Sequence, residues 1–133
     1  MDSVGAVQES YARCTLKGGF IDRFYDIFLA SHPGLAPMFR NTDFKEQKKL
    51  LRNGISMVIL FSQHNMMAAN SLNRIGESHG VRGMDIRADL YSYWSNSLMQ
   101  CVREFDTKLT PEVEAAWRKL IDNAVQHIIR VGK

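Results

Sequence analysis

The chain has 133 residues, which is long enough for one domain with a single sizeable core and too short for a second catalytic module. Hydrophobic residues make up 45% and charged residues 23%, an ordinary globular composition that argues against disorder. The net charge of +3 is too small an excess to indicate a nucleic-acid-binding protein, and the sequence has neither a signal peptide nor an apolar run long enough to cross a membrane, so we expect a cytoplasmic protein.

Helical spacing of apolar residues predicts the first elements. A helix over Ser3–Leu16 is expected to end at the Gly18–Gly19 pair, and a strongly apolar helix should follow over Phe20–Ser31. Pro33 cannot continue that second helix. The next few residues should therefore form a short, tight corner that brings Phe39 to the core.

The longest central helix is expected to begin at Thr42 or Asp43 and to end near Ser62. Its apolar residues share one helical face, on which Gln47 is a polar exception. Residues 65–70 read as a link to the next helical segment.

Two further helices complete the prediction. One is expected over Arg87–Phe105, after a loop. Thr110 then caps the last helix, because Pro111 suits the first helical position and acidic residues follow it. Strand-like alternation is absent from the sequence, so the whole chain is predicted to be a single all-α domain of roughly six to seven helices.

One short helical segment ends by presenting a histidine. Leu72, Ile75 and His79 recur at the spacing of one helical face, which should point into the protein. Gly80 and Gly83 should stop this helix, because glycine readily takes the left-handed conformation that a C-terminal cap needs. A neutral imidazole in this position is well placed to bind iron, and the alternative is a core histidine bonded to a backbone carbonyl.

Several separated motifs together resemble those of bacterial single-domain globins, and are most similar to the globin domains of flavohaemoglobins and related bacterial haemoglobins. In chain order the motifs are Phe24-Tyr25-x-x-Phe28, Ala30-Ser31-His32-Pro33, Met38-Phe39, Gln47-Lys48-x-x-Leu51, His79 and Ala116-Trp117. The resemblance covers nearly the whole chain. It implies a globin fold, the three-over-three helical sandwich, with haem b (iron protoporphyrin IX) held between the central helix and the helix that ends at His79.

The resemblance also implies roles for individual residues. His79 matches the proximal iron ligand, Phe39 the phenylalanine that packs on the porphyrin, and Leu51 the apolar residue that limits ligand space. Tyr25 and Gln47 match the distal pair, whose O–H and N–H groups are expected to hold O₂. The alternative for Tyr25 is a core tyrosine bonded to a backbone carbonyl, and for Gln47 a side chain turned towards solvent.

On the proximal side the sequence departs from the family pattern. Tyr91 resembles the proximal-side tyrosine of the group and is expected to contribute to the haem site. However, no Asp or Glu follows Asp122, where the group carries a glutamate bonded to the proximal histidine. A carboxylate there would make the imidazole more electron-donating, and the backbone carbonyl of Ile75 offers a partner for His79 instead.

The leading functional hypothesis is a globin that binds O₂ reversibly, along with NO and CO, and that supports NO dioxygenation when an external flavin reductase supplies electrons. No dinucleotide-binding or P-loop pattern occurs in the chain, so the electron donor is expected to be another molecule. The alternatives are a haem-based gas sensor that signals to a partner protein, and a globin-fold interaction module without haem. No nucleic-acid or membrane partner is expected.

Overall fold

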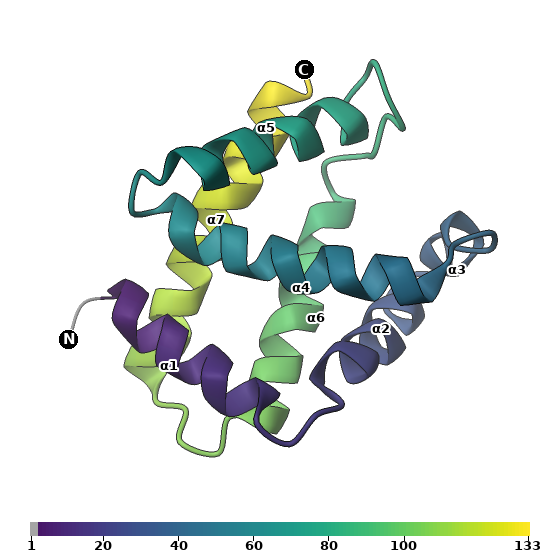
Figure 1. Ribbon diagram of the computed structural model, residues 1–133. Coiled ribbons are helices and arrows are strands. Elements are labelled where there is room, and N and C mark those ends of the chain that lie inside the picture. The colour runs from purple at the N-terminus through teal and green to yellow at the C-terminus, as the bar shows by residue number, and fades with distance from the viewer. Residues whose placement is uncertain (1–2) are drawn as a thin grey trace.

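The computed structural model describes residues 3–133, which form an all-helical arrangement (Figure 1). The helices are α1 (Ser3–Thr15), α2 (Phe20–Ala30), α3 (Leu35–Met38), α4 (Phe44–Phe61), α5 (Met66–His79), α6 (Leu90–Phe105) and α7 (Pro111–Val131). No strand occurs within this described range, which confirms the predicted all-α class. None of its helices is long and apolar enough to cross a membrane.

Side-chain caps fix where three of the helices begin. Asp43 caps α4, Asn65 caps α5 and Thr110 caps α7, each by accepting a hydrogen bond from a backbone N–H in the first turn. Such a cap satisfies an N–H group that has no partner within the helix. The predicted starts at Asp43 and Thr110 are therefore confirmed.

The prediction of a link over residues 65–70 is wrong. The helix that carries His79 begins at Met66, directly after its Asn65 cap, and Ala68 in this stretch is fully buried. The helix expected from Arg87 begins instead at Leu90. The chain between α5 and α6 is therefore a longer loop than the sequence indicated.

The predicted left-handed cap after His79 is also wrong. Gly80 has φ −81° and ψ −169°, which is extended backbone open to any residue. Among the described glycines, a positive φ is found only at Gly18 and Gly19, before α2. Gly80 therefore has a reason other than backbone conformation to be glycine.

A buried ionic cluster holds α1 against the turn between α6 and α7. The Asp106 side chain is fully buried and accepts hydrogen bonds from Arg13 Nε at 2.6 Å, Arg13 Nη2 at 2.9 Å and Ser10 Oγ at 2.6 Å. Trp117 Nε1 in turn donates to Ser10 Oγ at 2.9 Å. Burial raises the pKa of the Asp106 carboxyl, but the hydrogen bonds outweigh burial and the pKa is lowered.

The arrangement of α4 and α5 positions the candidate site. The two helices meet at the corner that joins them and diverge towards the start of α4 and the end of α5 (Figure 1). Helix α5 also packs against α7, and α2 packs against α6. Gln47, in the first turns of α4, and His79, the last residue of α5, therefore both lie at the wide end of this pair.

Candidate functional site

His79 is half-buried at the end of α5, and its ring makes a specific contact with the backbone. The ring Nδ1 lies 2.8 Å from the carbonyl oxygen of Ile75 and 3.1 Å from Ser78 Oγ. A carbonyl can only accept a hydrogen bond, so Nδ1 carries a proton, and in the neutral imidazole Nε2 is then the nitrogen without one. No residue in the described range forms a hydrogen bond with Nε2. The expected backbone partner, Ile75, is thus confirmed, and the same contact matches the alternative of a histidine bonded to a backbone carbonyl.

The loop after α5 folds back over the last turn of the helix and fixes its backbone. The N–H of Met84 donates to the carbonyl of Ser78 at 2.9 Å, and the N–H of Ile86 donates to the carbonyl of His79 at 2.8 Å. These bonds satisfy carbonyls that an ordinary helix end leaves without partners. The backbone of His79 is thus held by the residues that follow it.

Three aromatic side chains come together near the start of α4. The ring centroid of Tyr25, on α2, lies 6.3 Å from that of Phe39 and 5.5 Å from that of Phe44, both in edge-on contacts. Phe39 and Phe44 stack with their centroids 6.1 Å apart. The structure therefore brings Phe39 and Tyr25 together. Phe44 was not predicted as a site residue, although its place on the apolar face of α4 was a signal that could have indicated it.

Tyr25 also meets Gln47, but through the main chain of Gln47. The Tyr25 hydroxyl donates to the Gln47 backbone carbonyl at 3.4 Å, which matches the alternative of a tyrosine bonded to a carbonyl. This distance is longer than that of a strong O–H···O bond. Burial raises the pKa of Tyr25, and its hydrogen bond to Gln47 offsets only part of that rise. The hydroxyl therefore remains a proton donor at neutral pH.

Helix α4 borders open space at Gly54. Gln47, Leu51 and Gly54 lie on one face of α4 at positions i, i+4 and i+7, and Leu51 is buried whereas Gln47 is half-buried. A Cβ placed on Gly54 would meet no atom within 4 Å. The apolar side chain of Leu50, next to Leu51, is 64% exposed.

Apolar residues are similarly exposed in the loop that follows His79. Val81 is 64% exposed and Met84 is 61% exposed. Exposed apolar side chains that lie together often mark a surface that a ligand or partner covers. Haem iron is commonly held by a proximal histidine below a distal pocket that carries a hydrogen-bond donor, so the imidazole of His79 and the phenol of Tyr25 are groups of the kinds that fit haem.

Tyr91 lies on the side of α6 that is next to α7. It is half-buried, burial raises its pKa, and it lines a groove of about 220 Å³ with Val125 and Ile129 of α7. Within the described residues it forms no hydrogen bond with His79. The expected role of Tyr91 in the haem site stays a prediction.

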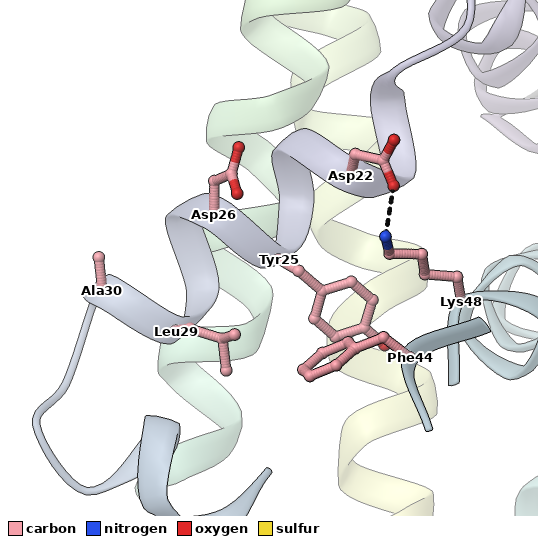
Figure 2. A pocket seen from close by; sticks show the side chains of 7 residues that line it. All are labelled: Asp22, Tyr25, Asp26, Leu29, Ala30, Phe44 and Lys48. Carbon is pink, nitrogen blue, oxygen red and sulfur yellow. Dashed lines mark ion pairs between the residues drawn. The ribbon is translucent and has the colours of Figure 1, made fainter. Parts of the chain in front are cut away.

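A cavity adjoins the ring of Tyr25. Its volume is about 470 Å³, and Figure 2 shows the Tyr25 and Phe44 rings lying together in its wall. Its lining residues are Asp22, Tyr25, Asp26, Leu29, Ala30, Phe44 and Lys48. Lys48 Nζ forms an ion pair with Asp22 at 2.7 Å, which joins α4 to α2. Neither His79 nor Leu51 lines this cavity, so it reaches neither the end of α5 nor the middle of α4.

Comparisons with known proteins agree with this geometry. A family model described as Globin matches residues 22–128. Among solved structures, protein PA3967 of Pseudomonas aeruginosa PAO1, described as structurally highly homologous to a human haemoglobin, is similar to the chain with a TM-score of 0.92. The two sequences are 34% identical, and the match covers 98% of each chain. No curated protein matches the chain.

Proposed function

This chain belongs to the globin family, and we propose that it holds haem b through His79 and binds O₂ reversibly, along with NO and CO. The observation that carries the proposal is that Nδ1 of His79 is bonded to the carbonyl of Ile75 while Nε2 has no hydrogen-bond partner among the described residues. That contact orients the ring and leaves Nε2 available for a metal, which is the arrangement of other histidine ligands that donate their second N–H to a carbonyl. Haem, when bound, supplies an iron atom that coordinates diatomic gases.

Tyr25 is the residue that we assign to the distal side. Its hydroxyl is a buried proton donor whose present partner, the Gln47 carbonyl, lies at the long distance of 3.4 Å. A hydrogen bond of that length is weak, so the hydroxyl can turn to a gas molecule at little cost. Phe39 and Phe44 hold the phenol ring in place while the hydroxyl changes partner.

The partner of His79 favours reversible binding. A backbone carbonyl is neutral, and it makes the imidazole less electron-donating than a carboxylate would. Strong electron donation by the proximal ligand promotes cleavage of the O–O bond. The arrangement around His79 and Ile75 therefore supports a gas-binding role over a peroxidase-like one.

The same site is proposed to support NO dioxygenation with an external flavin reductase. This reaction consumes one electron per turnover, and no second redox site is evident among the described residues. Tyr25 supports the proposal because its hydroxyl can stabilise a partial negative charge on bound O₂.

Absorbance spectroscopy tests the proposed function. The purified protein, titrated with haemin and recorded in ferric, ferrous and ferrous–CO forms, is expected to take up one haem per chain and to give a strong Soret band. Reversible oxygenation of the ferrous protein should follow. A protein that binds no haem would instead support the interaction-module alternative.

A further inference from the structure

The last turn of α7 lies in backbone contact with the turn of α5 that carries His79. A Cβ placed on Gly80 would overlap the backbone of Gly132. A Cβ placed on Gly132 would lie 2.8 Å from both the carbonyl oxygen of Gly76 and the Cα of Gly80. Distances this short are not tolerated by real Cβ atoms, so these glycines permit an approach that no other residue allows.

Backbone conformation does not explain these glycines. Gly132 has φ −78° and ψ −5°, and Gly80 has φ −81°, so an alanine could adopt either conformation without strain. In a helical conformation, replacing glycine by alanine usually stabilises a protein slightly. The requirement for glycine therefore comes from the contact between the two helices.

A hydrogen bond fixes the register of this contact. The N–H of Val81 donates to the carbonyl oxygen of Gly132 at 2.9 Å. One turn earlier, a Cβ on Gly76 would lie 2.8 Å from Val131 Cβ and 2.9 Å from the carbonyl oxygen of Ile128. The end of α7 thus contacts the chain on both sides of His79, at Gly76 within α5 and at Gly80 and Val81 just after it.

We propose that Gly132 is a positioning residue for the iron ligand, and that the end of α7 sets the position of the α5 backbone from which the His79 imidazole extends. This inference rests on the proposed function. Backbone atoms in direct contact have no side-chain rotamers with which to absorb a shift. A methyl group added at Gly132 would therefore push directly on the backbone at the end of α5 and so shift the His79 ring.

The test compares Gly132→Ala with two control variants. Lys133→Ala alters the neighbouring, exposed residue without adding an atom at the contact. Val7→Ala removes buried volume from α1 and lowers stability at a distance from the contact. Resonance Raman spectroscopy of the ferrous proteins reports the Fe–His stretching band, and transfer of haem to an excess of apomyoglobin reports haem release.

Gly132→Ala is expected to shift the Fe–His band and to speed haem release by on the order of ten-fold, as loss of a supporting contact does at other metal sites. Both controls should keep the wild-type band, even though Val7→Ala melts at a lower temperature. If Gly132→Ala keeps the wild-type band and haem release, or melts at a higher temperature than wild type, the positioning role is wrong.

A measurement on the wild-type chain covers the case in which Gly132→Ala does not fold. Hydrogen exchange of the haem-free protein should show the Val81 amide protected as well as amides within α5, because Gly132 accepts its hydrogen bond. Rapid exchange at Val81 would overturn the inference. Failure of the wild-type protein to show any Fe–His band would instead count against the proposed function.

Discussion

The carbonyl oxygen of Ile75 lies 2.8 Å from Nδ1 of His79, one helical turn before it, and so selects the tautomer of the imidazole. The contact lies within α5 and needs no other helix. It leaves Nε2 as the nitrogen able to bind a metal.

Replacing His79 with alanine is expected to abolish haem retention. Haem in this proposal is held by one axial bond together with apolar burial, and the assigned bond is lost. His64→Asn is the matched control, because His64 is exposed and has a φ of 59°, which asparagine tolerates. Haem content and the ferrous–CO spectrum are measured after purification. A wild-type spectrum from His79→Ala would show that the proximal assignment is wrong.

Tyr25→Phe is expected to speed O₂ dissociation more than Gln47→Leu does. A hydrogen bond to a charged group contributes about 1.5–3 kcal/mol, so losing the hydroxyl should raise the release rate by roughly ten-fold or more. In the structure Gln47 contacts Tyr25 through its backbone carbonyl, which leucine retains. Stopped-flow release rates measure both effects. Rates close to wild type for both variants would remove Tyr25 and Gln47 from the distal site.

NO consumption by the 133-residue chain is expected to stop after one round. The O₂-loaded protein should consume one NO per haem, and adding NADH alone should not sustain the reaction, because NADH needs a flavin reductase to pass its electrons on. Adding such a reductase should restore cycling. An NO electrode records the trace. Many NO molecules consumed per haem with NADH and O₂ alone would show that electrons enter by another route.

Asp106 is expected to make stability depend on pH in the acid range. Its pKa is lowered in the folded protein, so its contribution is fully present above the ordinary aspartate value of about 3.9 and is lost as the pH falls through the lowered value. Asp106→Asn should reduce the free energy of unfolding by about 2 kcal/mol at pH 7. It should also flatten the acid dependence. Urea unfolding at several pH values measures both, and an unchanged slope below pH 4 would contradict the assignment.

The two cysteines are expected to resist alkylation in the folded protein. Burial raises the pKa of Cys14 and of Cys101 to about 12, and both thiols are reduced and fully buried. At pH 8 the reactive thiolate is then on the order of one molecule in ten thousand. Iodoacetamide labelling, followed by mass spectrometry, should modify neither residue until denaturant is added. Rapid labelling under native conditions would show that the interface of α1 and α6 opens.

The sequence by itself determined the helical class, most helix ends and the contact of His79 with Ile75. These features are local: apolar spacing, caps such as Asp43 and Thr110, and the geometry of one helical turn all act within a few residues. Residues that share a helical turn meet however the rest of the chain folds.

Only the tertiary structure decided why Gly80 is glycine and which atom of Gln47 meets Tyr25. Gly80 was expected to permit a left-handed turn, yet it makes room for Gly132, and Tyr25 reaches a backbone carbonyl on another helix. Both contacts join residues that are far apart in the sequence. Their distances depend on how whole helices pack, which local patterns of residue type do not encode.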